Sequence, residues 1–430
     1  MRYDPAELKI LADDIFPYTV QVREDIHEHP ELGNQEYRTT ELIQKALTSF
    51  GFDEIYTGIA GGKTGVIGIL LSPEPGPTIA LRADIDALPI QEKTGLPFAS
   101  TQTSLLNGKV VSVMHACGHD CHTAMLLGAA SIFASHKYLF NGKLVFIFQP
   151  CEEGAANDWQ GPSGAKAVVQ SCLPYQNNKP DAIFGIHIAV NKYSTTSAKS
   201  RKNGYLPIAV GQMDYGMNQF KITVTGRSGH ANNPSSSVDA LLAASQIVVS
   251  LQSVITKNVN PRSNQASVSI GKMESGTAFN VISDYAYLYG ALRLTDISKH
   301  KYLEQKIEQI ASGIANIYGA TAEVQWTGFI PPLYNDPALS KTVEAALKNV
   351  DSHLVEKVHG IGCITGLDDF SFYTLDTPGY FLWLGSVPEE NYPLPAGNPH
   401  TPTYYVNENV LRYGVCAWLN MVGKYCEDHK

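Results

Sequence analysis

The stretch Thr78-Ile-Ala-Leu-Arg-Ala-Asp84 joins a short apolar run to two charged residues, and it indicates the fold class. Similar apolar runs, each bounded by turn residues, occur at Gly65–Leu71, Leu144–Phe148, Ala182–Ile186 and Tyr380–Leu384. Helical patterns such as Thr123–Ser135 lie between some of them. Residues 5–52 are also predicted to form helices, the last of which is stopped by Gly51. Apolar strands that alternate with helices predict an α/β domain with a mostly parallel sheet and helices on both faces.

Polar residues follow three of these runs directly. Arg82 and Asp84 come after Thr78–Leu81, Glu152 and Glu153 after Leu144–Phe148, and His187 after Ala182–Ile186. Ligands of an open α/β sheet bind beyond the carboxyl ends of its strands. We therefore expect three strands to deliver reactive groups to one edge of the sheet.

From about Ile208 the pattern changes to alternating apolar and polar residues, which is typical of an antiparallel sheet with one wet face. The alternation covers Phe220–Val224, Ala266–Ile270 and Tyr285–Leu294, and helices are predicted at Val238–Ile255 and Lys301–Ile317. Near Pro331 the helix and buried-strand pattern returns. We expect an α+β domain, residues 208–328, inserted into a catalytic domain made of residues 1–207 and 329–430.

Composition excludes several classes of protein. The formal net charge of −9 over 430 residues argues against a surface for nucleic acid or an anionic membrane. No apolar stretch reaches the roughly 18 residues of a membrane span, and the N-terminus lacks the pattern of a signal peptide. Seven scattered cysteines fit reduced thiols. We expect a cytoplasmic protein.

The run His115-Ala-Cys-Gly-His-Asp-Cys-His-Thr123 places six potential metal-binding residues in eight positions. Cys117 and His119 flank Gly118, so both side chains can leave a tight turn in similar directions. With Glu153, His187 and His400 they make a set of five candidate ligands. If the Cys117 thiolate and one water each bridge two metals, two four-coordinate sites are filled and the water is the reactive group. Such a set favours Zn²⁺, with Mn²⁺, Co²⁺ and Ni²⁺ as alternatives.

Two further roles follow from this hypothesis. Of the adjacent Glu152 and Glu153, one can bind metal while the other takes a proton from the water and passes it to a leaving amine. Asp84 is predicted to accept a hydrogen bond from a ligand histidine and so fix its tautomer.

For several of these residues a structural role is an alternative to metal binding. Cys117 and His119 alone would equally suit a buried thiol beside a hydrogen-bonded histidine. His115 and His122 could either support the candidate ligands or lie at the surface, and the sequence favours neither. The remaining candidates favour structural roles, namely His27 and His29 in a helical segment and Cys121 and Cys151 in the core.

The chain resembles a known family through a series of ordered motifs. They begin at Arg23-Glu-Asp-Ile-His-Glu-His-Pro-Glu31 and end at Pro399-His-Thr-Pro402. Between them lie Arg82-Ala-Asp-Ile-Asp-Ala-Leu-Pro89, the cysteine–histidine run, Glu152-Glu-Gly154, Gly185-Ile-His187, Gly229-His-Ala231 and Asn280-Val-Ile282. Together they are similar to peptidase family M20, in its amidohydrolase branch, which includes hippurate hydrolases, auxin-conjugate hydrolases and bacterial aminoacylases.

The resemblance implies a zinc-exopeptidase-like catalytic domain with two divalent metals per chain. It implies Cys117, His119, Glu153, His187 and His400 as ligands and Glu152 as general base. It further implies that the inserted domain mediates dimerisation, and that this domain contributes His230, Asn280 and Arg293 to substrate or oxyanion binding. Two departures from the family pattern are Ser283, where proline is frequent, and Asp368, where glutamate is frequent.

We therefore expect a metal-dependent hydrolase of N-acyl amino acids that forms a homodimer or a tetramer. A metal-bridging hydroxide would attack the amide carbonyl, and Glu152 would carry the proton to the leaving nitrogen. One alternative is a dipeptidase or carboxypeptidase. Another is a non-catalytic metal-dependent peptide-binding protein, which would have no use for a free carboxylate at position 152.

Overall fold

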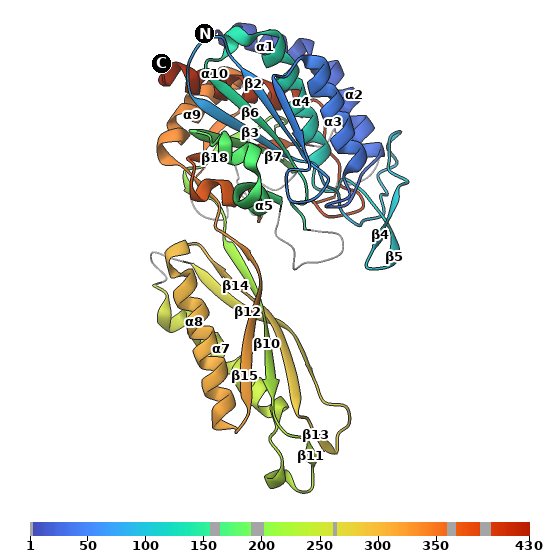
Figure 1. Ribbon diagram of the computed structural model, residues 1–430, viewed down its shortest axis with the longest axis vertical. Helices are drawn as coiled ribbons and strands as arrows, with labels where there is room; N and C mark the ends of the chain where they lie inside the picture. Colours follow the sequence, from blue (N-terminus) through green and yellow to red (C-terminus); the bar gives the residue numbers. More distant parts are fainter. Residues whose placement is uncertain (1–2, 155–163, 191–201, 261–264, 359–366, 388–396) are drawn as a thin grey trace. The chain divides into compact units, whose positions relative to one another are not determined.

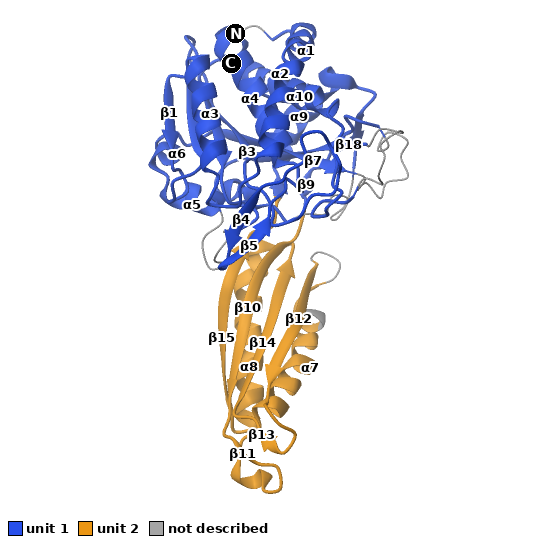
Figure 2. Cartoon of the chain, turned by 90° about the vertical axis from the view of Figure 1, so that its right-hand side faces the viewer, with its two compact units in different colours: residues 1–213, 334–430 blue, residues 214–333 orange. Residues whose placement is uncertain are grey.

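The computed structural model of the protein describes residues 3–154, 164–190, 202–260, 265–358, 367–387 and 397–430. The chain divides into two compact units (Figure 2). Unit 1 comprises Met1–Met213 and Tyr334–Lys430, and unit 2 comprises Asp214–Leu333. The boundaries expected from the sequence, 208 and 328, lie five or six residues earlier at each end. Each unit has a hydrophobic core of its own.

Unit 1 is built on a six-stranded sheet (Figure 1). Its strand order is β1 (Glu54–Thr57), β2 (Val66–Leu71), β6 (Lys143–Gln149), β3 (Thr78–Asp84), β7 (Ala182–Val190) and β18 (Gly379–Ser386). The last four strands run parallel to one another, whereas β1 and β2 pair antiparallel at one side. Every residue of β7 is buried, as expected for a central strand covered on both faces, and so is every residue of β18 at the edge of the sheet. The predicted fold class is therefore confirmed.

Helices cover this sheet. They are α1 (Pro5–Asp14), α2 (Phe16–Glu28), α3 (Tyr37–Phe50), α4 (His119–Ser135), α5 (Gly164–Ser171), α6 (Leu173–Asn177), α9 (Pro337–Asp351) and α10 (Val410–Asp428). Helix α4 is buried along nearly its whole length, because it packs on β3, β6 and β7 and also contacts α2, α3 and α10. The short helix η4 (Asp369–Leu375) contacts β7, β18 and α5. Helix α3 ends at Gly51, which adopts a left-handed conformation as the sequence predicted.

One expectation about the strand ends is wrong. Strand β3 includes Arg82 and Asp84, and β7 continues past His187 to Val190, so these polar residues lie within strands and not beyond them. Asp84 pairs with Gln149 of β6, and His187 pairs with Trp383 of β18. The backbone ladder does not depend on side-chain polarity, and buried polar side chains are tolerated where they find partners. Only Glu152 and Glu153 follow the end of their strand.

Unit 2 contains a four-stranded antiparallel sheet and two helices. The strand order is β12 (Ala266–Ser275), β14 (Tyr285–Leu294), β10 (Gly216–Thr225) and β15 (Thr321–Ile330). Helices α7 (Ala240–Asn258) and α8 (His300–Ile317) contribute apolar side chains to a common core with Phe220, Ile222 and Leu288. On the other face, Lys221 Nζ lies 4.3 Å from the ring centre of Tyr287. Two short strands, β11 (Gly229–His230) and β13 (Val281–Ile282), pair separately.

Candidate metal centre

The cysteine–histidine run forms a turn that leads into α4, because the helix begins at His119. Gly118 precedes it with φ +90°, a left-handed conformation that favours glycine. A Cβ atom at this position would lie 2.8 Å from the Tyr404 hydroxyl. The turn therefore allows Cys117 and His119 to leave the backbone close together.

Glu152 and Glu153 follow β6 in a turn that is held by two buried carboxylates. The Cys151 N–H donates to Glu36 Oε1 at 2.9 Å, and the Glu153 N–H donates to Asp86 Oδ2 at 2.9 Å. Cys151 has a positive φ of 58°, which a residue with a side chain rarely adopts. This strained residue lies directly before the glutamate pair.

His187 and His400 reach the same region from distant parts of the chain. His187 lies in β7, with its Nε2 atom 3.5 Å from Cys117 Sγ. His400 is half exposed, has a positive φ of 64°, and donates its backbone N–H to Ala116 O at 2.8 Å. Its Nε2 atom lies 2.9 Å from Glu153 Oε1. The bond to Ala116 ties His400 to the cysteine–histidine turn.

All five candidate ligands fall into two groups. Cys117, His119 and His187 form one, and Cys117, Glu153 and His400 form the other. Within each group the potential ligand atoms lie within 4.8 Å of one another. Cys117 is the one residue that belongs to both.

The orientation of the histidines suits metal binding. Nδ1 of His119 donates to the backbone oxygen of Asp86 at 2.9 Å and approaches Asp86 Oδ1 at 3.1 Å, while Nδ1 of His187 donates to Ile188 O at 2.7 Å. Because Nδ1 carries the proton of the neutral ring in both residues, Nε2 of each neutral ring has a lone pair that a cation can accept. His119 Nε2 is buried without a hydrogen-bond partner among the described residues, and Glu153 Oε1 has the ion-pair contact with His400 but no hydrogen bond of normal geometry there. A divalent cation would satisfy both atoms.

The charges around this cluster are predominantly negative. Burial raises the pKa of the Cys117 thiol, and the charge of Glu153 raises it further. Burial, followed by the charges of Asp368 and Glu153, raises the pKa of Glu152 well above its ordinary value. Both the burial of these groups and the repulsion from neighbouring carboxylates disfavour their anionic forms, which bound cations would stabilise.

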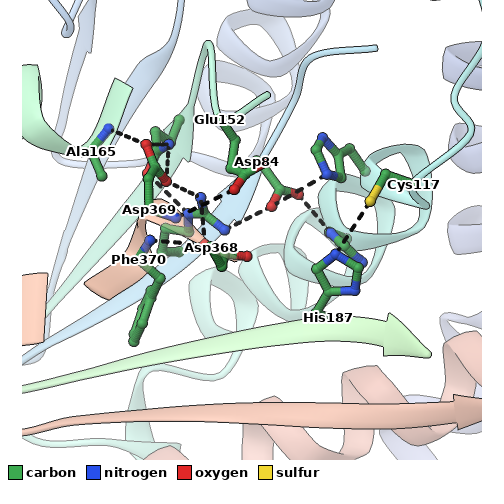
Figure 3. A network of polar contacts seen from close by, with 12 residues as sticks. Asp84, Cys117, Glu152, Ala165, His187, Asp368, Asp369 and Phe370 are labelled. Carbon is green, nitrogen blue, oxygen red and sulfur yellow. Dashed lines mark hydrogen bonds and ion pairs between the residues drawn. The ribbon is translucent and has the colours of Figure 1, made fainter. Parts of the chain in front are cut away.

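Glu152 lies beside the ligands and also beside a second group of carboxylates (Figure 3). It is close to His119 and Glu153 on one side and to Asp368 and Asp369 on the other. Its Oε1 atom accepts the backbone N–H of Asp369 at 3.3 Å. Glu152 is thus held near the candidate ligands without being a member of either group that contains Cys117.

Asp84 was expected to accept a hydrogen bond from a ligand histidine, but in the structure the carboxylate beside Nδ1 of His119 is that of Asp86. Asp84 Oδ1 accepts from His122 Nδ1 at 2.6 Å, and its Oδ2 atom lies 3.7 Å from His119 Nε2. The acceptor on the proton-bearing nitrogen of His119 is Asp86. Sequence reasoning missed Asp86 and left His122 open. The spacing could have revealed Asp86, because alternate residues such as Asp84 and Asp86 share one side of an extended segment.

The other histidines near the site have different surroundings. His27 is buried in α2, with Nδ1 2.8 Å from Asp120 Oδ2 and Nε2 3.2 Å from Glu92 Oε1. His115 is buried, and neither ring nitrogen has a hydrogen-bond partner in the described part of the chain. Among those residues, neither histidine belongs to a group that could hold a metal.

The three candidate residues of unit 2 do not lie together. His230 in β11 is exposed, and the neighbouring Ala231 N–H donates to Asn280 O at 3.1 Å. Arg293 is exposed near the last residue of β14. Tyr285, the first residue of this strand, is the one that follows Asn280 closely in the sequence. Arg293 is eight residue steps along the strand from Tyr285, which corresponds to about 27 Å. His230 and Asn280 are neighbours, whereas Arg293 is remote from them.

Comparison with known proteins identifies the family. Residues 80–424 match peptidase family M20/M25/M40. The chain belongs to this family. It is 36% identical over 402 residues to N-acetylcysteine deacetylase of Bacillus subtilis (strain 168), an alignment that covers 93% of this chain and 95% of that protein.

Two further relatives cover almost the whole chain. Thermostable carboxypeptidase 1 of Saccharolobus solfataricus is 33% identical over 423 residues, which is 97% of this chain and 98% of that protein. The crystal structure of the Bacillus subtilis YXEP protein, described as a dinuclear metal-binding peptidase of family M20, superimposes with a TM-score of 0.76. It is 31% identical and covers 96% of this chain and 99% of that one. None of the described helices has the length and apolar character needed to cross a membrane.

Proposed function

We propose that this protein is a metal-dependent amidohydrolase that cleaves N-acyl amino acids to a carboxylic acid and a free amino acid. The observation that carries the proposal is the pair of ligand groups joined at Cys117, with Glu152 beside them. In this assignment Cys117, His119, Glu153, His187 and His400 hold two divalent ions, with Zn²⁺ or Mn²⁺ favoured and Co²⁺ or Ni²⁺ as alternatives. Bound ions of this kind polarise a carbonyl oxygen and acidify water.

The chain's own residues supply proton transfer. Glu152 accepts a proton from the attacking water and delivers it to the departing amino acid nitrogen, which amide cleavage requires. The Asp369 N–H holds one of its carboxylate oxygens at 3.3 Å, so the other oxygen is available for this transfer. The carboxylate form of Glu152 is the active one, and bound cations would favour it by offsetting the charges of Asp368 and Glu153.

We further propose that the active form is a dimer in which His230 and Asn280 act in the partner's site. Both are exposed, whereas Arg293 lies about 27 Å along β14 from Tyr285, the first residue of that strand. One small substrate cannot contact both ends of the same unit 2. A two-fold dimer would let one chain contribute Arg293 and its partner contribute the His230 end.

The relatives favour one alternative, because N-acetylcysteine deacetylase and thermostable carboxypeptidase 1 are similar to this chain to nearly the same degree. A carboxypeptidase would use the same centre on a peptide, whose acyl group is itself an amino acid. The two functions differ in the pocket that receives the acyl group.

A substrate panel tests the proposal. The purified protein, loaded with Zn²⁺ or Mn²⁺, is assayed for liberated amine with N-acetylcysteine, N-acetylmethionine, hippurate and a set of dipeptides. We expect at least one N-acyl amino acid to have the highest kcat/KM. Higher values for the dipeptides would establish the carboxypeptidase instead. Tight binding of metal without hydrolysis of any substrate would indicate a binding protein.

A further inference from the structure

Figure 3 shows a polar network that includes Asp84, Asp368 and Asp369, and a buried guanidinium contacts all three of these carboxylates. Arg82 is 1% exposed, and each part of its side chain contacts a different partner. Nε donates to Gln149 Oε1 at 3.0 Å, Nη1 to Asp84 Oδ2 at 2.7 Å and Nη2 to Asp369 Oδ1 at 2.8 Å. The planar fork of an arginine fixes the directions of all three bonds at once.

The first arm of the network leads from Arg82 to His187. Asp84 accepts from Arg82 with one oxygen and from His122 Nδ1 with the other. His122 Nε2 in turn accepts the backbone N–H of Ile188, the residue after His187, at 2.8 Å. The His122 and His187 rings lie 4.5 Å apart between centres. This arm therefore fixes the strand position from which His187 reaches Cys117.

The second arm leads from Arg82 to Glu152. Asp369 Oδ1 accepts from Arg82, while both of its oxygens lie within 3.0 Å of Gln149 Nε2. Its Oδ2 atom also accepts the Ala165 N–H at 2.9 Å. With its side chain held in this way, Asp369 presents its own N–H to Glu152 Oε1. This arm therefore fixes the carboxylate of Glu152.

Arg82 also offsets the negative charge of the carboxylates around it. Asp84, Asp368 and Asp369 are buried, and Glu152 lies in one carboxylate group with the last two. Arg82 Nη2 is 3.4 Å from Asp368 Oδ1 in addition to its contact with Asp369. Without this cation, several carboxylates would face one another in a medium of low dielectric.

We propose that Arg82 is a positioning residue that sets the placement of Glu152 through Asp369 and that of His187 through Asp84 and His122. The inference rests on the proposed function, because it assigns Glu152 as base and His187 as ligand. Arg82 does not touch substrate in this scheme. Its effect reaches the reaction through two arms that can be cut separately.

Two isosteric substitutions cut the two arms. In Asp369→Asn the amide can still accept from Arg82, but its NH₂ group then faces the Ala165 N–H and the Gln149 NH₂, and the segment must shift. In Asp84→Asn the NH₂ group faces either Arg82 or the His122 N–H, both of which are donors. Tyr373→Phe is the matched control, because it removes a buried 3.1 Å hydrogen bond to Gln149 Oε1 and leaves both arms intact.

We expect Asp369→Asn to lower kcat by about 10–100-fold, the usual effect of a group that orients a reactive residue, with KM and metal content unchanged. Asp84→Asn should instead lower the metal affinity by a similar factor. In the Glu152→Gln background, Asp369→Asn should have almost no further effect, because the residue through which it acts is already disabled. Tyr373→Phe should change the melting temperature more than kcat.

Three results would overturn the proposal. One is an equal loss of kcat in Asp369→Asn and Tyr373→Phe, which would mean general destabilisation. Another is an undiminished effect of Asp369→Asn in the Glu152→Gln background. The third is an unchanged position of Glu152 in a crystal structure of the metal-free Asp369→Asn variant. If Asp369→Asn does not fold, Arg82→Lys replaces it, because a single ammonium cannot make three divergent bonds. This variant cuts both arms, so its kcat is compared at saturating metal.

The crystallographic result separates this inference from the proposed function. Should the wild type cleave no amide, the proposed function fails, while the placement of Glu152 by the Arg82 network is still tested in metal-free crystals. Should the wild type be active and Glu152 stay in place in Asp369→Asn and Arg82→Lys, this inference alone fails.

Discussion

The candidate residues of unit 1 and those of unit 2 differ in how strongly the surrounding structure holds them. Cys117, His119 and His187 are buried and have fixed partners. His230 and Arg293 are exposed on unit 2. The His230 ring has one contact with a neighbouring backbone, at 3.1 Å between Asn232 N and Nδ1.

This difference indicates two kinds of function. A preorganised cluster is the expected setting for groups that must bind ions or move protons in fixed geometry. Exposed side chains act when another surface meets them, which for unit 2 is a partner chain or a substrate. The four predictions below test this division, beginning with the largest expected effect.

Glu152→Gln should abolish most activity while the metals stay bound. The amide preserves the shape of the side chain but cannot accept the proton, so we expect a loss of kcat of at least about 10²–10⁴-fold. Kinetics and metal analysis of the same preparation provide the measurement. Glu153→Gln is the matched control and should lose metal together with activity. Near-normal turnover of a fully loaded Glu152→Gln variant would remove this residue from the mechanism.

His230→Ala should lower kcat by about 10²–10³-fold, as the loss of an oxyanion donor does in other hydrolases, without affecting the metals. If His230 acts in the partner's site, mixing this variant with Glu152→Gln under subunit exchange should restore activity. About half of the dimers would be mixed, each with one complete site, so about a quarter of wild-type activity should return. Demonstrated exchange without recovery would mean that His230 does not act across a dimer.

The sequence predicted the parts of this protein that depend on local patterns. The buried strands and the helices of unit 1 follow from runs of apolar residues and from residues that end an element, such as Gly51. The ends of the strands were harder to predict from the sequence. Arg82, Asp84 and His187 continue their strands, because their neighbours satisfy them in ways that no local pattern records.

The site was predictable to the extent that its residue types are diagnostic. The density of ligand-forming residues around Cys117 was visible in the sequence, whereas the grouping of five candidates into two sets that meet at Cys117 needed coordinates. The role of Asp86 was missed, although its spacing of two from Asp84 places both carboxylates on one side of an extended segment. In the sequence Asp368 stood out only as a departure from the family pattern, whereas in the structure it lies in one group with Glu152.

Removal of metal should destabilise unit 1 and leave unit 2 unchanged. A ligand present at about 100 times its Kd stabilises the folded state by roughly 2.7 kcal/mol, and the candidate ligands all lie in unit 1. Hydrogen–deuterium exchange before and after chelation should therefore show faster exchange in α4 and the turn after β6, but not in β10 or β14. Cys117→Ser is the control and should respond weakly to the chelator. Equal changes in both units would contradict the division.

The smallest effect concerns the backbone that prepares the centre. Gly118→Ala places a side chain on a residue with φ +90°, which costs roughly 1–2 kcal/mol. The new Cβ would also lie 2.8 Å from the Tyr404 hydroxyl and 3.4 Å from Ile188 Cβ. We expect a lower melting temperature together with a lower metal affinity, because the turn that carries Cys117 must shift.

Gly51→Ala separates these two consequences. Gly51 has φ +81° at the end of α3, and a Cβ there would meet nothing within 4 Å. Its replacement should therefore carry a similar backbone cost without moving the candidate ligands. Thermal unfolding and metal titration of both variants form the comparison, with metal affinity lowered in Gly118→Ala alone. If Gly118→Ala lost stability but bound metal as tightly as Gly51→Ala, the candidate ligands would tolerate movement of their backbone. The centre would then depend less on preorganisation than its burial suggests.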